Sequence, residues 1–537
     1  MTPNTAIEFL VWLLIAASVI AVVASRLRIP YTVALVIGGL ALGSLHGLPL
    51  LKIFSQGQRP NWLTTNIVLI LFLPPLLFEG SIKIHFHLLR KNLVPILLLA
   101  NVGVLVATLI TGFAIHWAFG LPLMLALLFG SMISATDPIS VLSIFEEMGV
   151  GKRLSTIVEG ESLFNDGTAV VLFGILAEGI TSGHLNVATG VAEFVVVVLG
   201  AAALGAFLGF IFSEITRRID DPRVEITLTT ILAYSSYLLA QSLHLSGVIA
   251  TVVAGLMVGN FGTRVGMSPR TRVALWSFWD YAAFVINSLL FLLIGMQVRI
   301  GDLIQAWHAT LLAIGAVLIG RALSVYALTP VSNLFAQKVP LAWQHVLVWG
   351  GLRGALALAL ALSLDPALPH RSELLAWTFG VVAFSLIAQG LTIKPLLRLL
   401  GVTGTTESEY ERVRVSQLAL AAARAELEHL RGSQALSAPL YTTLQQELDG
   451  HLAQVESEIE EMYREDTSRA EEELRTARIQ LDSAQKEAIR RALRDGMISA
   501  TTAAKMIDAV GRQLQALGET PPGEQENPAE VRENQAP

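Results

Sequence analysis

Long apolar runs, separated by short charged or turn-rich breaks, constrain the fold of this chain more than any other feature. Hydrophobic residues make up 53% of its 537 positions and charged residues only 15%, whereas soluble globular chains carry about 25% charged residues. This composition excludes a large soluble enzyme. A helix needs about 20 mostly apolar residues to cross a bilayer, so the sequence predicts an all-α polytopic membrane protein. Thirteen runs qualify as spans: 6–25, 30–50, 62–80, 93–118, 121–147, 154–180, 191–216, 224–243, 246–262, 273–297, 303–329, 342–364 and 373–398.

Charge divides the chain sharply near residue 400. Residues 1–400 hold 22 Lys and Arg against 18 Asp and Glu, whereas the last 137 residues hold 15 against 25. This predicts a transmembrane domain over 1–400, a cytoplasmic helical tail over 401–518 and a disordered C-terminus over 519–537. The net charge of −6 gives no case for nucleic-acid binding, and the lack of cysteine excludes disulfides and thiolate metal sites.

The Lys and Arg residues near the span ends predict the orientation, because cytoplasmic loops carry an excess of them. With the N-terminus outside, sixteen of these residues fall on or near the inner side and four on the outer side. The chain is therefore predicted to lie in the cytoplasmic membrane with its N-terminus outside and its tail in the cytoplasm. No Lys or Arg precedes Arg26, so the first span is interpreted as a retained helix rather than a signal peptide.

Ionisable side chains at membrane depth are costly, so each is a functional candidate. The fifth span contains Thr136-Asp137-Pro138. Proline removes a helix donor and disfavours helix at the preceding residue, which predicts a break at Thr136 and Asp137. Such a break frees backbone carbonyls beside a carboxylate, and these oxygens suit a small cation. A kinked helix with a satisfied Asp137 is the structural alternative.

The sixth span carries three carboxylates within eight residues. Glu159, Ser162 and Asp166 share one helical face, and Glu161 and Asn165 form the adjacent stripe. Three carboxylates so close would repel one another if all were ionised without a cation or an arginine nearby. Burial at membrane depth marks Asp166 as the strongest candidate, whereas Glu159, near the inner end, is equally well explained as a solvated residue.

A glycine-rich stretch over 349–354 surrounds Arg353 in the twelfth span and is able to bend or unwind. At 1.5 Å per residue, Asp137, Asp166 and Arg353 lie about 15–18 Å deep, near the middle of a ~30 Å core. Spans 5 and 12 are seven apart and therefore run in opposite directions. Paired interruptions of this kind are typical of an inverted-repeat transporter, so both interrupted helices are predicted to meet at one ion site.

Two lesser candidates are Arg321 and Asp280. Arg321 in span 11 could neutralise a carboxylate or a helix C-terminus, and a purely structural role is equally consistent with its burial. Asp280 in span 10 could line an inner funnel, although a polar contact between helices explains it more simply.

Three motifs in this order resemble the electroneutral sodium/proton antiporters, the NhaP-like branch of the monovalent cation/proton antiporter family. They are Thr136-Asp137-Pro138, the run Gly-Glu-Ser-Leu-Phe-Asn-Asp-Gly over 160–167, and Gly351-Leu352-Arg353-Gly354. The resemblance covers about residues 6–398 and not the tail. It implies a thirteen-helix homodimer in which a core bundle moves against a dimerisation domain.

The resemblance also implies roles for individual residues. Asp166 matches the carboxylate that binds either cation or proton, and Asn165 holds the position that marks the electroneutral type. Positions that coordinate or shape the ion site, and so the ligands of the transported Na⁺, match Thr136, Asp137 and Ser162. A buried pair that holds the unwound region together matches Glu161 and Arg353.

The residues and the resemblance together predict a secondary antiporter, not an enzyme, that exchanges Na⁺ for H⁺ without a cofactor and serves pH and cation homeostasis. Transport of Li⁺ or K⁺ stays open, and a K⁺-preferring exchanger is the first alternative. A cation channel fits less well, because the polar groups converge at mid-depth with apolar stretches on both sides. An intramembrane enzyme could use Asp137 and Asp166 as an aspartyl pair, but Arg353 in a glycine-rich span fits that poorly.

Overall fold

The computed structural model describes most of the chain and divides it into two compact units, residues 1–263 with 271–409 and residues 264–270 with 410–537. The parts described are 3–27, 31–44, 65–182, 187–219, 221–263, 267–297, 301, 306–403, 406–433, 435–465 and positions within 474–510. The predicted disordered segment 519–537 lies outside the described residues.

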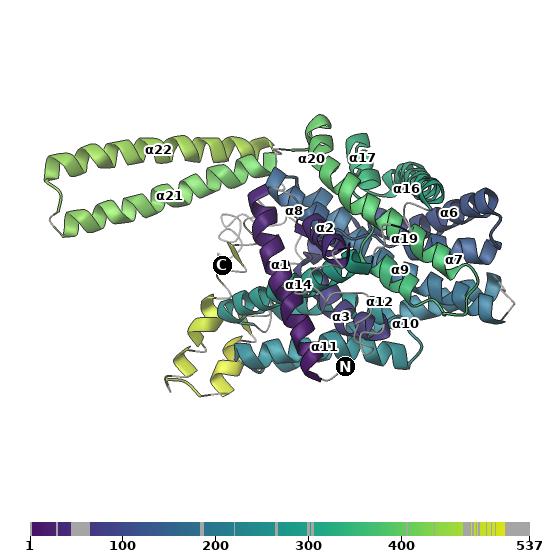
Figure 1. Ribbon diagram of the computed structural model, residues 1–537. Helices are drawn as coiled ribbons and strands as arrows, with labels where there is room; N and C mark the ends of the chain where they lie inside the picture. Colours follow the sequence, from purple (N-terminus) through teal and green to yellow (C-terminus); the bar gives the residue numbers. More distant parts are fainter. Residues whose placement is uncertain are drawn as a thin grey trace, which may run out of the picture. The chain divides into compact units, whose positions relative to one another are not determined.

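Helices account for the first unit, and no strand occurs among the described residues, which confirms the all-α fold (Figure 1). Helical segments overlap each of the thirteen predicted ranges. By length and composition, eight of the described helices could each cross a membrane, whereas the count of thirteen spans stays a prediction. The helices are α1 (Pro3–Leu27), α2 (Tyr31–Ser44), α3 (Thr65–Lys83), α4 (Phe86–Lys91), α5 (Leu93–Leu97), η3 (Leu98–Gly103), α6 (Val104–Phe119), α7 (Leu123–Ser134), α8 (Ile139–Met148), α9 (Lys152–Ser182), α10 (Val187–Thr216), α11 (Pro222–Ser242), α12 (Gly247–Met257), η4 (Val258–Gly262), α14 (Pro269–Gln297), α16 (Trp307–Phe335), α17 (Leu341–Trp349), α18 (Ala355–Leu362), α19 (Arg371–Phe384), η5 (Ser385–Gln389) and α20 (Gly390–Leu399).

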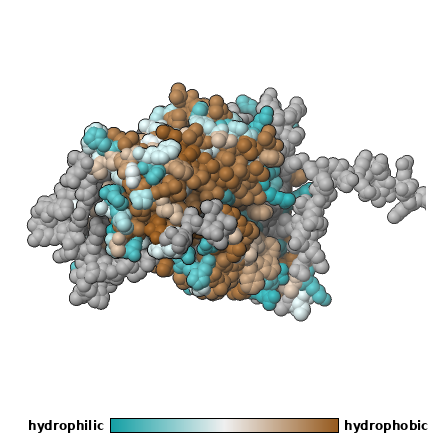
Figure 2. Space-filling view, turned by 90° about the vertical axis from the view of Figure 1, so that its right-hand side faces the viewer, coloured by the Kyte–Doolittle hydropathy of each residue, from teal (hydrophilic) through white to brown (hydrophobic). Residues whose placement is uncertain are grey.

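The surface of this unit is apolar where lipid would cover it. Large apolar side chains on α10 are well exposed, among them Val196, Leu199 and Phe207 at 62–64%. Figure 2 shows one face of the molecule on which hydrophobic residues form a broad area. A soluble protein rarely exposes an apolar patch of this extent, so the surface agrees with a bilayer as the solvent.

Two membrane helices are interrupted, both where the sequence predicted a break. The first interruption separates α7 from α8 over residues 135–138, and Ala135 there has extended backbone angles. The second separates α17 from α18 over residues 350–354. Both interruptions belong to helix pairs with many buried residues, which meets the requirement that non-helical backbone at membrane depth be enclosed by protein.

The second unit contains a helical hairpin of α21 (Thr406–Gly432) and α22 (Ala438–Glu465). Polar and aromatic contacts join its two helices. Tyr441 donates a hydrogen bond to Glu428 at 2.6 Å and lies under the Arg431 guanidinium, and Arg424 pairs with Asp449 at 3.7 Å. Side-chain contacts between the two helices therefore stabilise the hairpin in addition to the helix propensity of its residues.

Candidate functional site

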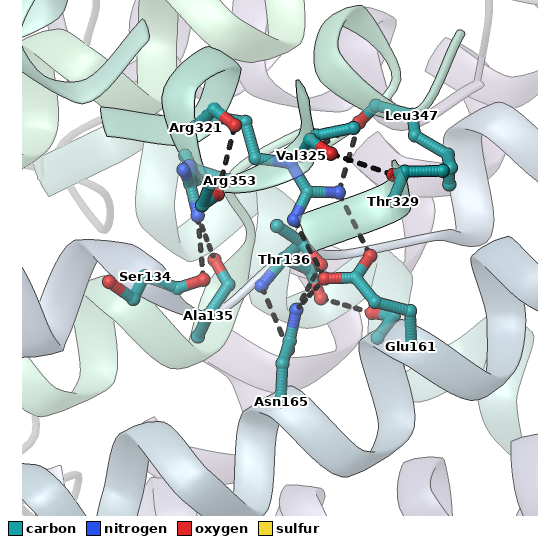
Figure 3. A network of polar contacts seen from close by, with 12 residues as sticks. Ser134, Ala135, Thr136, Glu161, Asn165, Arg321, Val325, Thr329, Leu347 and Arg353 are labelled. Atoms are coloured by element: carbon teal, nitrogen blue, oxygen red, sulfur yellow. Dashed lines mark hydrogen bonds and ion pairs between the residues drawn. The ribbon is translucent and has the colours of Figure 1, made fainter. Parts of the chain in front are cut away.

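The first interruption is clamped to the middle of α9 by side chains of that helix. Asn165 donates from Nδ2 to Thr136 Oγ1 at 2.6 Å and accepts the Thr136 backbone N–H on Oδ1 at 3.3 Å. Ser162 donates its hydroxyl to the Thr136 carbonyl. Figure 3 shows Asn165 rising from its helix toward Thr136. Both ends of the Asn165 amide are therefore bonded to Thr136, which holds the first interruption in position.

The two interruptions touch each other. The Asp137 backbone N–H donates to the Leu352 carbonyl at 2.7 Å, so extended backbone from one break satisfies the other. A Cβ added at Gly354 would lie 2.3 Å from the Cβ of Asp137. Position 354 therefore requires glycine, because any side chain there would displace Asp137. The predicted meeting of the two interrupted helices is confirmed.

Arg321, on α16, neutralises Glu161. Its Nη1 and Nη2 donate to the two carboxylate oxygens of Glu161 at 2.7 and 2.9 Å, and both side chains are buried. The same guanidinium donates from Nε and Nη2 to the Leu347 carbonyl near the end of α17, at 3.2 and 2.9 Å (Figure 3). Arg321 fills both roles proposed for it from the sequence, the neutralisation of a carboxylate and of a helix C-terminus.

Arg353 makes different contacts from those implied by the family resemblance, and the expected pair between Glu161 and Arg353 is wrong. Nη1 of Arg353 donates to the carbonyls of Ser134, at 2.6 Å, and Ala135, at 3.4 Å. Its backbone N–H donates to Ser385 Oγ at 2.8 Å. The reason is geometric, since Arg321 already occupies both oxygens of Glu161 and leaves Arg353 to act on it only through space.

Both arginines thus serve the carbonyl ends of broken helices. The last carbonyls of a helix have no intrahelical donor and carry partial negative charge, which a cation stabilises. Arg353 covers the end of α7, and Arg321 covers the end of α17. The helix that precedes each interruption therefore has one guanidinium bound near its carbonyl end.

Asp166 differs from the other carboxylates of the site. Its Oδ1 is buried and accepts no hydrogen bond from any described residue, whereas Oδ1 of Asp137 accepts the Ile139 N–H at 3.0 Å. Asp137 and Glu161 lie within electrostatic range of Asp166. A buried carboxylate oxygen without a donor is costly unless the group is neutralised. Asp166 is therefore the carboxylate of this site that a proton or a cation would stabilise most.

Accessibility separates the residues of this site into two groups. Glu161, Ser162 and Asn165 are buried, whereas Asp137 and Asp166 are only partly buried. The first three hold the interruption together, and the two aspartates are less enclosed than these three residues.

The remaining candidates lie apart from this cluster of contacts. Asp280 forms an ion pair with Lys83, which also binds Glu79 at 2.5 Å, so it makes a polar contact between α14 and α3. Glu159 is partly buried and lies within electrostatic range of Glu79 and Lys83. Neither residue contacts the interruptions in the hydrogen bonds and ion pairs described above.

Two residues that support the second interruption were missed from the sequence. Ser385 accepts the Arg353 N–H, and Gln389 donates to the Trp349 carbonyl at 3.1 Å. They lie four residues apart in the π-helical turn η5, and such turns occur frequently at functional sites. Two polar residues one helical turn apart within an apolar run were the signal available in the sequence.

A helical membrane domain in which two interrupted helices meet around partly buried carboxylates defines an ion-coupled secondary transporter. The chain belongs to the sodium/hydrogen exchanger family, since the model of that transmembrane family matches residues 13–399. This confirms the resemblance found in the three motifs.

Named relatives extend the comparison. The chain is 44% identical to the Na(+)/H(+) antiporter NhaG of Bacillus atrophaeus over 409 residues, which cover 74% of this chain and 76% of that protein. It is 34% identical to the Na(+)/H(+) antiporter NhaS2 of Synechocystis sp. over 523 residues, or 96% and 94% of the two chains. The structure of the sodium proton antiporter MjNhaP1 from Methanocaldococcus jannaschii shares the fold, with a TM-score of 0.61, 23% identity and coverage of 75% and 100%.

Proposed function

We propose that this protein exchanges Na⁺ for H⁺ across the cytoplasmic membrane by competition of the two ions for Asp166. The single observation that carries the proposal is the buried Oδ1 of Asp166, which no described residue satisfies. Relatives at 40–44% identity bear the names of Na(+)/H(+) antiporters, which favours Na⁺ over a K⁺-preferring exchanger. Coupling then needs no ATP, because each ion leaves only when the other replaces it.

The charges of the site support a one-for-one exchange. Glu161 is cancelled by Arg321 in their ion pair. Arg353 donates to the carbonyls of Ser134 and Ala135, a few residues before Asp137, and its one positive charge equals in size the one negative charge of Asp137. The charge left over belongs to Asp166, and one proton or one Na⁺ neutralises it. An unloaded site would carry an uncompensated charge at membrane depth, which disfavours its passage across the bilayer.

The oxygen atoms around the first interruption form the proposed Na⁺ site. Asp166 and Asp137 supply carboxylates, and the backbone of Thr136 and the hydroxyl of Ser162 supply neutral oxygens. Asn165 positions Thr136, and its amide is occupied there. Freed carbonyls next to a carboxylate are the ligands by which interrupted helices of transporters hold Na⁺.

The proposal includes the topology and assembly expected from the sequence. The N-terminus lies outside, the tail lies in the cytoplasm, and two copies form a homodimer in the bilayer. The balance of Lys and Arg supports the orientation, and the family resemblance supports the dimer.

The test is ion flux in proteoliposomes with a trapped pH dye. An outward Na⁺ gradient should drive H⁺ uptake, while an equal K⁺ gradient should drive little. Movement of protons with K⁺ alone would assign the chain to the K⁺-preferring exchangers. Movement of Na⁺ without protons would indicate a channel and contradict the proposal.

A further inference from the structure

We divide the helices of the first unit into two bundles by their close backbone contacts. The second bundle comprises α1, α2, α3, α10, α11, α12, η4 and α14, and the site bundle comprises α5, η3, α6, α7, α8, α9, α16, α17, α18, α19, η5 and α20. In the second bundle a Cβ at Gly39 would lie 2.3 Å from the Leu292 carbonyl oxygen, and one at Gly205 would lie 2.3 Å from that of Ala250. In the site bundle a Cβ at Gly130 would lie 2.6 Å from a carbonyl oxygen of α6. Backbones packed this closely resist sliding.

Glycine contacts between the two bundles are of another kind. The atoms nearest to Gly80, Gly167 and Gly390 across the boundary are side-chain carbons of Leu163, Ile249 and Val33. Helices that meet through side-chain ends can slide past one another by small amounts, whereas interlocked backbones resist such sliding. The packing therefore allows the site bundle to move against the second bundle as a body, as alternating access requires.

A buried hydrogen bond crosses this boundary next to the ion site. The hydroxyls of Thr32 on α2 and Ser140 on α8 are bonded to each other, and each residue is 2% exposed. Ser140 lies in the first turn of α8, three residues after Asp137. The bond thus joins the second bundle to the helix that begins at the first interruption.

The α2 side of this bond is fixed to its own bundle. Tyr31, the neighbour of Thr32, stacks on Phe284 with ring centroids 5.2 Å apart and binds the Ser288 hydroxyl. Gly43 further along α2 packs against the backbone of Met296. Movement of the site bundle would therefore carry Ser140 away from Thr32 rather than drag α2 along.

We propose that Thr32 and Ser140 form a latch, a hydrogen bond that holds the transporter in one access state and that breaks in each transport cycle. This inference rests on the proposed exchange function, since only a transporter needs two access states. The latch sets the balance between the states, and so the apparent affinity for the ion on each side.

Cysteine cross-linking tests the latch in the full-length chain, which has no cysteine of its own. In the variant Thr32→Cys/Ser140→Cys the two side chains start from hydroxyl contact, near the separation that a disulfide requires. Oxidation with copper phenanthroline should reduce Na⁺-driven H⁺ movement at least about tenfold, because the cross-linked protein can no longer leave the access state in which Thr32 and Ser140 are in contact. Reduction should restore it.

The matched control is Ser236→Cys/Thr251→Cys, a buried pair whose hydroxyls lie 3.2 Å apart within the second bundle. Its oxidation should leave exchange unchanged. Full exchange by the cross-linked latch pair, or failure of that pair to cross-link in any ionic condition, would overturn the latch. Exchange by the reduced variants tests the proposed function separately, so the two failures are distinguishable.

Single substitutions give a second readout. Thr32→Val and Ser140→Ala each remove the bond with little change in shape, and each should shift the apparent Na⁺ affinity about two- to tenfold in the same direction. The double variant should shift it no further than the larger single effect. Additive shifts, or none, would contradict the latch.

Discussion

Both interruptions are non-helical breaks within a membrane helix, but the first carries an acidic side chain and the second a basic one. The first, over 135–138, contains a carboxylate and is clamped through Thr136 by side chains of α9. The second, over 350–354, contains a guanidinium and glycine and is held through Trp349 and Arg353 by side chains of η5. Arg353 of the second then neutralises the freed carbonyls of the first. The comparison teaches that one break holds the carboxylate of the proposed cation site and the other supplies a positive charge to the carbonyls beside it.

Replacing the carboxylate of Asp166 on α9 should have the largest effect on exchange. Asp166→Asn keeps the shape of the side chain but removes the group that alternates between proton and cation. Exchange should fall to the level of protein-free liposomes while the protein stays folded. Glu178→Gln, at an exposed position of the same helix, is the control and should behave as wild type. Na⁺-dependent proton movement retained by Asp166→Asn would remove this residue from the mechanism.

The next largest effect is on stability, and it should distinguish the role of Arg321 from that of Arg353. Arg321→Gln leaves Glu161 buried without its partner, which should cost about 3–5 kcal/mol of stability. Adding Glu161→Gln should recover part of that loss, because the uncompensated charge is gone.

The same rescue tried with Arg353→Gln should fail, since Arg353 bonds to carbonyls rather than to Glu161. Thermal unfolding of the two single variants and the two double variants in one detergent measures this. If Glu161→Gln rescued Arg353→Gln and not Arg321→Gln, the assignment of the pair would be reversed.

The contact between the interruptions can be broken by one methyl group. Gly354→Ala places a Cβ 2.3 Å from that of Asp137, and overpacking of this kind costs about 1–3 kcal/mol. Exchange should drop sharply because Asp137 is displaced. Gly315→Ala on α16, where no atom lies within 4 Å of the added Cβ, is the matched control. Equal activity of the two variants would show that the contact does not matter.

The smallest predicted effect concerns Ser162, one of the α9 side chains that hold the first interruption in place. Ser162→Ala removes one hydrogen bond to the Thr136 carbonyl, worth about 0.5–1.5 kcal/mol. The KM for Na⁺ should rise a few-fold with little change in maximal rate. Ser155→Ala, on the same helix and with its hydroxyl 3.5 Å from the carbonyl of Gly151 just before that helix, should leave KM unchanged. A fall in rate without a change in KM would place Ser162 outside the ion site.

The sequence predicted those features that depend on local chemistry. Pro138 and the glycines of 349–354 disfavour helix locally, so the positions of both breaks followed from the chain alone. The partner of Glu161 did not follow. Arg321 and Arg353 both lie within spans, and the rotation and packing of three helices decide which one reaches the carboxylate. The contributions of Ser385 and Gln389 depend in the same way on which face of the last helix meets the break.

The response of exchange to membrane potential tests most directly that Asp166 alone alternates between H⁺ and Na⁺. Glu161 is paired with Arg321, and the positive charge of Arg353 equals in size the negative charge of Asp137, so one proton should leave for each Na⁺ bound. No net charge then crosses the membrane. The account predicts that the Na⁺/H⁺ equilibrium in proteoliposomes is the same with and without a valinomycin-clamped potential. Each net charge moved would respond to 100 mV with about 2.3 kcal/mol, so an equilibrium that shifts with the clamped potential would contradict the account.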